Sequence, residues 1–347
     1  MSAYSSTEFL RIMMDRVGRA IPADLSNREA LAAWQDKARE KLRELLTQDA
    51  MDKCRPLELT YEWMPVPGDL VRERCVLQTE QDVWMPFFVL RKEGTTGPAV
   101  IIVPQDGTGK FGSVWADDYE WFHKQDEAAR TRFLRRWEAA SKLAAEGCLV
   151  VAPDIRGTGE RREWMDEGED RFSVSSRRPV NNVAIALGQS LAGETCHELS
   201  MLADLMRARR DCDGRVYLAG YNDGAAMALF AAAADASFDG LAILNGFCGF
   251  RDGVVPSASS TAGTYVPNLY RWFERGDVGA LVAPRPMVLV ISADDPQNGP
   301  EFENALPQID ELKKAYDLLG AHDRLIVRSE KAVVDVLDAG HLSLVLR

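Results

Sequence analysis

The segment of the chain best suited to chemistry is a five-residue turn, Gly220-Tyr-Asn-Asp-Gly224. An apolar, strand-like run at 216–219 precedes it, and a helix-like run of small residues follows it. Glycines at both ends allow a sharp bend and a close approach of helix to strand. Such a turn projects its middle residue, Asn222, and presents the N–H of Asp223 beside it. A plain strand-to-helix connection, with small residues for packing, explains the pentapeptide equally well.

Nucleophilic catalysis at such a turn also needs an acid that orients a histidine. Asp295 follows the apolar run 287–291 and directly precedes Pro296, and its neighbour Asp294 is the alternative. An acid just past a strand end lies where a parallel sheet delivers its functional groups. Either aspartate, taken alone, is better explained as a cap for the next helix.

The histidine is predicted to be His341. Of the four histidines, at 123, 197, 322 and 341, the first two precede the turn, and His322 is typical of an exposed helix end. His341 follows two strand-like segments, 324–328 and 332–337. A single histidine is more often structural than catalytic. The turn, the acid and the histidine in this order favour catalysis.

Composition excludes several other functions. The 347 residues include 41 basic and 53 acidic side chains, for a net charge of -12, which disfavours nucleic acid and anionic membranes as partners. No stretch approaches the roughly 18 apolar residues of a membrane span. Six cysteines without a C-x-x-C pair predict reduced thiols in a cytoplasm rather than zinc or disulfides. No metal cluster and no cofactor motif is found.

Short apolar runs alternate with helical patterns along most of the chain, which predicts a doubly wound, mostly parallel α/β sheet. The buried strands are expected at 99–103, 148–152, 216–219, 241–244 and 287–291. The helices are expected at 126–146, 193–210, 223–235 and 303–319. An antiparallel hairpin, 70–78 with 83–91, is expected to precede them, which gives about eight strands in all.

Two further divisions of the chain are predicted. Residues 1–60, with a helix at 29–46, form an N-terminal helical extension that packs on the main domain, 61–347. The segments 157–185 and 246–275 are polar or aromatic insertions, expected to line a pocket like a lid at the carboxyl ends of the strands.

These features together resemble the α/β-hydrolase superfamily, and within it the branch of acetyl-xylan-esterase-like and dienelactone-hydrolase-like proteins. The turn resembles the G-x-S-x-G nucleophile elbow, and Ala283-Pro-Arg-Pro286 resembles the branch's A-P-R-P. Asp154-x-Arg156-Gly-x-Gly159 and the segment 186–193 also resemble it. The resemblance spans about residues 30 to 341.

The resemblance implies a role for each site residue. Asn222 occupies the nucleophile position, Asp295 is the acid and His341 the base. The oxyanion hole is formed by the backbone of Asp223 and of Asp106 and Gly107, in the loop that carries His-Gly in the family.

Four more residues are candidate contacts to a substrate: Arg156, Tyr221, Phe247 and Trp272. For each aromatic residue, packing under a lid is at least as good an explanation. An arginine at position 156 more often pairs with a structural acid.

The departure at Asn222 leaves several functions open, because a carboxamide nitrogen does not attack esters. The first is an esterase-like scaffold with Asn, natural or introduced, in place of the nucleophilic Ser. The second is a non-hydrolytic enzyme, such as a lyase, decarboxylase or cyclase, and the third is a ligand-binding pseudoenzyme. In a minor variant, Asn222 stands for a nucleophilic aspartate. The expected partner is a small-molecule ester or related carbonyl compound, and homo-oligomers are compatible with the sequence.

Overall fold

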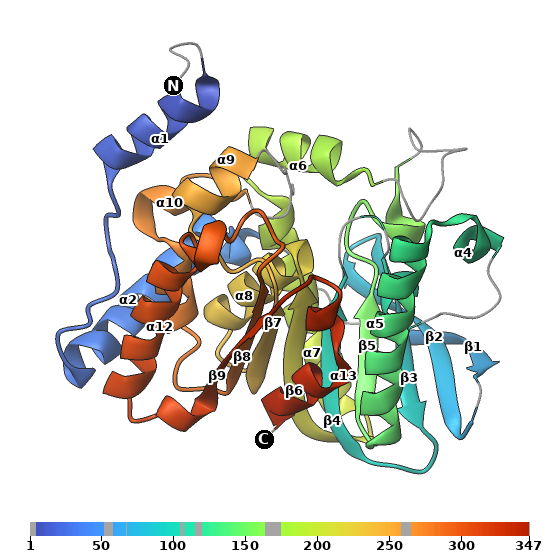
Figure 1. Cartoon of the computed structure of the whole chain (residues 1–347). Helices are drawn as coiled ribbons and strands as arrows, with labels where there is room; N and C mark the ends of the chain where they lie inside the picture. Colours follow the sequence, from blue (N-terminus) through green and yellow to red (C-terminus); the bar gives the residue numbers. More distant parts are fainter. Residues whose placement is uncertain are drawn as a thin grey trace.

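The structure of the protein, a computed structural model, describes residues 5–51, 58–66, 68–104, 107, 109–114, 120–163, 175–257 and 265–346. Nine described strands form one sheet through the centre of the molecule (Figure 1). They are β1 (Glu58–Pro65), β2 (Leu70–Glu80), β3 (Val83–Lys92), β4 (Gly97–Val103), β5 (Leu149–Pro153), β6 (Cys212–Tyr221), β7 (Gly240–Leu244), β8 (Met287–Ser292) and β9 (Leu325–Glu330).

The sheet is mostly parallel and ends in an antiparallel meander. The strand order is β1-β2-β3-β5-β4-β6-β7-β8-β9. Strands β5, β4, β6, β7, β8 and β9 run parallel, whereas β1, β2 and β3 are antiparallel to their neighbours. Four of the parallel strands, β4, β5, β7 and β8, are almost wholly apolar because helices cover both faces of this part of the sheet.

Helices lie on both faces of the sheet and across one of its edges (Figure 1). The α-helices are α1 (Ser6–Val17), α2 (Arg28–Leu45), α3 (Phe111–Val114), α4 (Glu120–Lys124), α5 (Glu127–Ala145), α6 (Arg177–Ala186), α7 (Leu191–Ala208), α8 (Asp223–Ala234), α9 (Val255–Ser257), α10 (Leu269–Trp272), α11 (Arg275–Ala280), α12 (Leu306–Leu318) and α13 (Ala339–Ser343). A short 3-10 segment, η8 (Asp335–Leu337), precedes α13.

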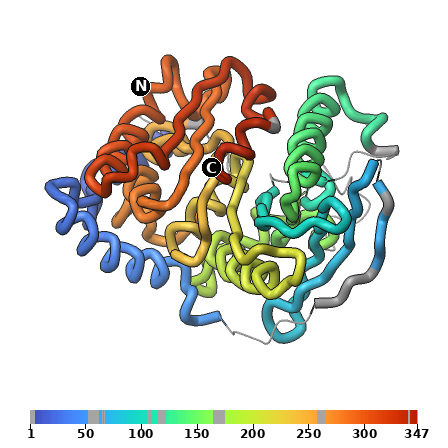
Figure 2. Tube along the Cα trace, turned by 90° about the horizontal axis from the view of Figure 1, so that it is seen from below, coloured from blue at the N-terminus to red at the C-terminus, as the bar shows by residue number. Residues whose placement is uncertain are grey.

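One apolar core lies on each face of the sheet, between the strands and the helices that cover them. Helices α2, α7, α8, α11 and α12 pack on one face of the sheet, and α3, α5 and α13 on the other. The view from below in Figure 2 shows α5 on the side of the sheet opposite to α7 and α8. Helices α6 and α9 lie above the edge at which the parallel strands end (Figure 1). In open α/β sheets this edge holds the functional site.

Side-chain caps fix where the long helices begin. Asp126 accepts a hydrogen bond from the N–H of Ala129 at the start of α5, and Ser190 accepts one from Gly193 at the start of α7. Asn27 caps α2 in the same way. Each cap satisfies a backbone donor that the first helical turn leaves without a partner.

The predicted fold class is confirmed, and so are all seven predicted strands of the hairpin and the parallel core. One expectation is wrong. The segment 332–337 is not a strand, because the chain turns after β9 through η8 into α13. The strand β1, which pairs with β2, is an additional strand that the sequence patterns did not indicate.

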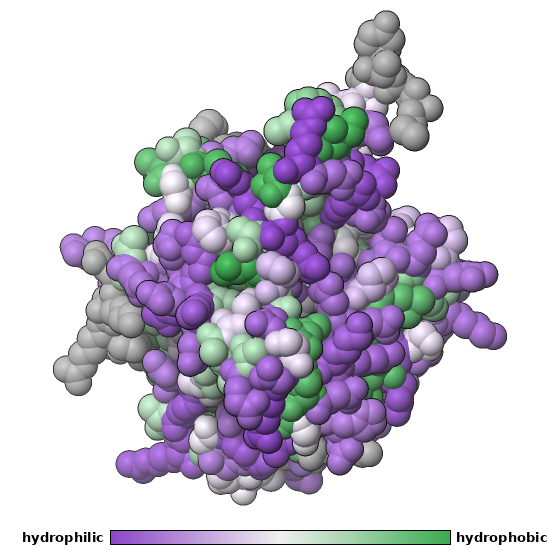
Figure 3. Space-filling model, turned by 90° about the vertical axis from the view of Figure 1, so that its left-hand side faces the viewer, coloured by the Kyte–Doolittle hydropathy of each residue, from purple (hydrophilic) through white to green (hydrophobic). Residues whose placement is uncertain are grey.

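The two N-terminal helices differ in how they are held. Helix α2 buries four apolar side chains, whereas α1 buries none. The exposed apolar residues of α1 include Phe9, Leu10 and Ile12, and Figure 3 shows hydrophobic atoms gathered on this helix. None of the described helices is both long and apolar enough to cross a membrane.

Candidate active site

The turn between β6 and α8 holds Asn222 in a conformation that is rare for a residue with a side chain. Its φ is 47° and its ψ is -107°. The N–H of Asn222 donates to the carbonyl of Leu244 at the end of β7, and its own carbonyl accepts from Ala225. The backbone is therefore fixed on both sides of the turn. Strain of this kind is concentrated at functional sites.

Three glycines make this turn possible because backbone atoms pass where their Cβ atoms would stand. A Cβ on Gly220 would lie 2.4 Å from the carbonyl oxygen of Gly224. A Cβ on Gly224 would lie 2.2 Å from the carbonyl oxygen of Val103, and one on Gly246 would lie 2.6 Å from that of Asn222. The glycine spacing in the sequence thus reflects close packing of α8 against β6 and β4.

The end of β4 borders the turn, as an oxyanion loop requires. The carbonyl oxygens of Val103 and Pro104 both face Gly224. Gly107 has φ 84° in the following turn, whereas Asp106 lies outside the described residues. Asp223 is the first residue of α8, whose positive dipole end favours an anion here. The roles of Asp106, Gly107 and Asp223 in an oxyanion hole stay predictions.

A buried ion pair holds the loop that follows β4. The ammonium of Lys110 contacts the carboxylates of Asp154 and Glu160, and the backbone N–H of Lys110 donates to Asp154 at 2.7 Å. Lys110 and Asp154 are both fully buried. A Cβ on Gly159 would lie 2.2 Å from Asp154, which explains the glycine in the D-x-R-G-x-G segment. This segment therefore positions the loop beside the elbow.

His341 contacts an acid, but not the one predicted from the sequence. Its Nε2 lies 3.2 Å from Oε1 of Glu330 at the end of β9, and its Nδ1 lies 3.3 Å from the carbonyl oxygen of Val336. Both partners are acceptors. A neutral imidazole has one N–H and can donate to only one of these two acceptors, whereas the imidazolium form donates to both.

The two predicted acids make other contacts. Asp295 accepts a hydrogen bond from the N–H of Gln297 at 3.0 Å, and Asp294 is exposed. Burial, and then the charge of Asp294, raises the pKa of Asp295. Among the described residues, no hydrogen bond or ion pair joins His341 to Asp294, Asp295 or Asn222. The cause is the path of the chain after β9, since α13 packs against α5 and turns His341 toward Glu330.

The four candidate substrate contacts are engaged within the protein. Tyr221 and Phe247 are buried in the two cores, and burial raises the pKa of the Tyr221 hydroxyl. The ring of Trp272 lies 4.2 Å from the ammonium of Lys41 on α2. Arg156 pairs with three glutamates, described below. The structural explanations considered for these residues account for the contacts that they make.

Sequence reasoning missed Glu330 and a polar group at the ends of β7 and β8. Asn245 donates to the hydroxyl of Ser292 at 2.9 Å and accepts from its N–H at 2.8 Å, and Asn298 donates to the carbonyl of Ser292. All three are fully buried. Glu330 could have been found by the rule applied to Asp295, because it ends the next strand. Nothing in the sequence patterns pointed to the other three.

A cleft of about 370 Å³ opens beside His341 and is lined by Arg135, Glu330, Val334, Asp335 and Asp338. Among the described residues there is no cluster of three or more histidine, cysteine or acidic side chains that could hold a metal ion. The described residues at this edge of the sheet offer a fixed turn, a helix dipole and an acid–histidine pair.

The sequence matches no protein-family model and no curated protein. Solved structures resemble the fold. A protein from Bacteroides fragilis, assigned as an acetyl xylan esterase, matches with a TM-score of 0.75 at 16% identity, over 95% of this chain and 83% of that chain. A glucuronoyl esterase from Solibacter usitatus matches with a TM-score of 0.63 at 14% identity, over 92% and 94%.

A third similar structure is acetyl xylan esterase 1 from a Thermoanaerobacterium species, with a TM-score of 0.53, 14% identity, and coverage of 84% and 86%. Sequence identities this low support a shared fold and do not establish a shared activity. The strand order, the strained turn between β6 and α8 and these similarities agree: the protein has the α/β-hydrolase fold and resembles esterases of that fold.

Proposed function

We propose that this protein is an esterase-like α/β hydrolase in which Asn222 stands where a serine nucleophile would stand. It binds a small ester or related carbonyl compound at the elbow and does not form an acyl-enzyme. The observation that carries the proposal is the backbone of Asn222, with φ 47° and ψ -107° between β6 and α8. This turn is the one on which α/β hydrolases present their nucleophile.

The proposed loss of covalent catalysis follows from the chemistry of a carboxamide. The nitrogen of Asn222 shares its lone pair with the carbonyl and carries no hydroxyl proton for a histidine to remove. Acyl transfer by the serine route needs both a nucleophilic oxygen and a base. The pair of His341 and Glu330 supplies the acid–histidine part, with Glu330 in the role first assigned to Asp295.

What remains at the elbow favours binding of a polarised carbonyl. The side-chain amide of Asn222 is a hydrogen-bond donor, and the start of α8 carries partial positive charge. The similar structures are named as acetyl xylan, glucuronoyl and methyl esterases, so we propose that the ligand is an ester of a carbohydrate.

The test uses methyl D-glucuronate and acetylated xylose with the intact protein. Saturation-transfer NMR should show that protons of at least one ester are close to the protein. The same spectra should show no release of methanol or acetate above the rate in buffer. Asn222→Phe, which fills the elbow, should abolish the transfer, whereas Leu134→Ser, at an exposed position of α5, should leave it unchanged.

Two results would contradict the proposal. Steady release of methanol or acetate that Asn222→Phe abolishes would mean that the elbow hydrolyses esters without a serine. Transfer that survives in Asn222→Phe, or no transfer with either ester, would mean that the elbow is not the binding site for this class of compound.

A further inference from the structure

A second cleft, of about 560 Å³, lies apart from His341 between α6 and the turn that joins β2 to β3. Ligand sites in proteins commonly have volumes of about 300–1,000 Å³ and combine apolar walls with a few fixed polar groups. The lining is Asp82, Val83, Trp84, Arg156, Gly157, Arg161, Glu163, Pro179, Val180, Val183, Ala184, Leu187 and Glu194. No function has so far been given to this cleft.

One wall of the cleft is an apolar stripe along α6. Val180, Val183, Ala184 and Leu187 recur at helical spacing and face the cleft together. Val183 and Leu187 are 63% and 74% exposed, although a surface helix normally turns such side chains inward. Trp84, on the opposite wall, is also exposed. The two walls therefore offer an unfilled apolar slot.

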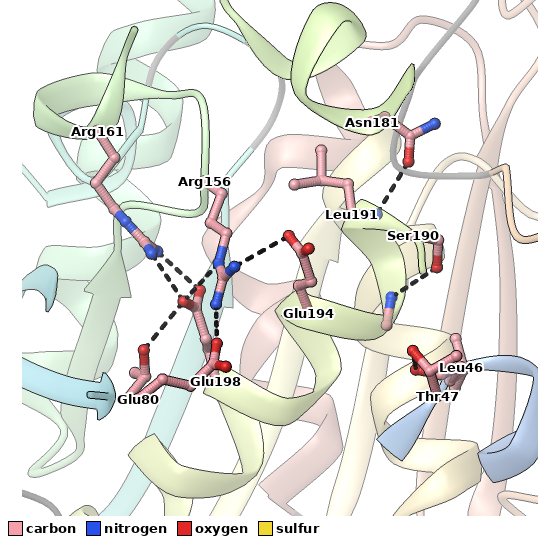
Figure 4. Close-up of polar contacts among 12 residues, drawn as sticks. Leu46, Thr47, Glu80, Arg156, Arg161, Asn181, Ser190, Leu191, Glu194 and Glu198 are labelled. Atoms are coloured by element: carbon pink, nitrogen blue, oxygen red, sulfur yellow. Dashed lines mark hydrogen bonds and ion pairs between the residues drawn. The ribbon is translucent and has the colours of Figure 1, made fainter. Parts of the chain in front are cut away.

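Three of the lining residues, Arg156, Arg161 and Glu194, belong to a cluster of two arginines and three glutamates, shown in Figure 4. Glu198, on α7, is satisfied: Arg161 donates two hydrogen bonds of 2.7 Å to its two oxygens, and Arg156 donates one of 3.0 Å. Burial opposes ionisation of Glu198, but these two guanidinium groups outweigh it and lower its pKa to about 2. Arg156 also binds Glu80 at the end of β2.

Glu194, one helical turn before Glu198, is the carboxylate left over. Its only ion pair among the described residues is with Arg156 at 3.3 Å, and neither of its oxygens accepts a hydrogen bond from them. The residue is 7% exposed. Burial raises its pKa, the charge of Arg156 opposes this, and the charges of Glu198 and Glu80 add to it.

The cluster therefore has three carboxylates for two guanidinium groups, and both guanidinium groups are already bound. A buried carboxylate without hydrogen bonds is costly unless it is protonated or meets a cation. We propose that this cleft binds a small amphipathic amine, with its ammonium group on Glu194 and its apolar body between Trp84 and the stripe on α6.

The charges around the cleft favour an amine over a carboxylic acid of the same shape. Asp82 and Glu163 add two more acidic groups to the lining, so the cleft is acidic overall despite its two arginines. An anionic ligand would have to displace Glu198 or Glu80 from Arg156 or Arg161. A cationic ligand displaces nothing and completes the hydrogen bonds of Glu194.

The test compares three probes that share a phenyl ring and differ in the head group: phenethylamine, 2-phenylethanol and 3-phenylpropionate. Calorimetric titration of the intact protein near neutral pH should show the amine binding at least tenfold more tightly than the alcohol. The carboxylate should bind more weakly still. Equal affinities for the three probes, or tighter binding of the carboxylate, would overturn the proposal.

Two variants locate the binding. Glu194→Gln keeps the size of the side chain and should reduce the amine's affinity to that of the alcohol. Trp84→Ala should weaken the amine and the alcohol by the same factor. An amine affinity that Glu194→Gln leaves unchanged in a protein with native circular dichroism would exclude Glu194 as the receptor.

The pH dependence gives an independent check. Glu194 must be ionised to hold the ammonium group, and the groups that face it are Arg156, Arg161, Glu80 and Glu198. As the pH is lowered, Glu194 takes up its proton earlier than an exposed glutamate would, because its pKa is raised. Amine binding should therefore be lost at a higher pH than it would be with an exposed glutamate. Binding to this cleft should be the same in Asn222→Ala, so its failure and failure of the elbow proposal are separate results.

Discussion

At the scale of single residues, Asn222 is held in place by its backbone rather than by its side chain. A φ of 47° with a ψ of -107° is the mirror image of an ordinary extended conformation, which only glycine adopts without strain. Strain of this kind costs about 1–3 kcal/mol. We therefore expect Asn222→Gly to raise the free energy of unfolding in urea by about 1 kcal/mol, after the entropy cost of glycine.

Asn268 is the matched control. Its φ of 64° and ψ of -1° lie in the left-handed region that asparagine tolerates. Asn268→Gly should therefore change the unfolding free energy less than Asn222→Gly does. If Asn222→Gly lowers stability while Asn268→Gly does not, the turn is not strained and the side chain of Asn222 stabilises it.

Glu198 and Glu194 should respond in opposite ways to the same change. Glu198→Gln leaves Arg161 and Arg156 without their shared carboxylate, and breaking a buried ion pair costs about 3–5 kcal/mol. Glu194→Gln removes a buried charge without hydrogen bonds and should change the unfolding free energy by less than about 1 kcal/mol, or raise it. Urea unfolding at neutral pH measures both. Equal losses would show that the two carboxylates are equally satisfied.

The pH dependence of stability has a definite sign for Glu198. Its pKa falls from an ordinary 4.5 to about 2 in the folded protein, so the unfolded chain binds its proton first. Its contribution is therefore present above about pH 4.5 and is lost as the pH falls from there toward 2. Relative to the native protein, Glu198→Gln should be less destabilised by acid over this range. A parallel loss in both proteins would contradict the assignment.

At the scale of elements, the packing of α8 against β4 positions the elbow. A Cβ on Gly224 would lie 2.2 Å and 2.7 Å from two backbone carbonyl oxygens, which cannot move aside as a side chain could. Gly224→Ala should cost about 3 kcal/mol or more of unfolding free energy. Gly249→Ala, whose nearest neighbour would lie 3.4 Å away, should cost less than about 1 kcal/mol. Similar values for the two would mean that α8 shifts freely against the sheet.

The predicted elements show what apolar patterns determine. Runs such as 99–103 and 241–244 are buried on both faces, so their position in the sheet follows from composition alone. The strand β1 was missed because it lies at the edge of the sheet, where one neighbour and partial exposure leave a weak pattern. The elbow was recognisable because two glycines and a buried helix leave few alternatives at that turn.

The site beyond the elbow was less predictable. The partner of His341 depends on how the chain turns between β9 and α13, a path set by packing of α13 on α5 rather than by local sequence. The apolar residues at 333, 334, 336 and 337 form a pattern that predicts a strand. In the structure this segment instead contains the 3-10 turn η8, and most of its apolar side chains pack against the core. The same limit applies to Arg156, whose three partners come from β2 and α7 and are distant in sequence.

At the scale of the whole molecule, the two N-terminal helices should contribute very differently to stability. Helix α1 buries no residue and is joined to the body by ion pairs between Arg11 and Asp252 and between Asp15 and Arg251. Exposed ion pairs contribute about 0–1 kcal/mol each. Removal of residues 1–18 should therefore lower the unfolding free energy by no more than about 2 kcal/mol.

Helix α2 is the comparison. Leu42 is fully buried in the core that α2 shares with α8, and Leu42→Ala should cost about 2–5 kcal/mol. Urea unfolding of the shortened protein and of Leu42→Ala measures both. If removal of α1 proves the more damaging change, its exposed apolar face is covered in solution.

The central claim is that the elbow presents residue 222 where a serine nucleophile would stand, with a carboxamide in place of the hydroxyl. The most direct test is labelling with a fluorophosphonate probe, followed by mass spectrometry of the peptide that contains position 222. The native protein should not be labelled there. Asn222→Ser should be labelled at the new serine, and adding His341→Ala or Glu330→Gln should slow labelling, whereas adding Asp295→Asn should not. A folded Asn222→Ser protein that takes up no probe would contradict the account.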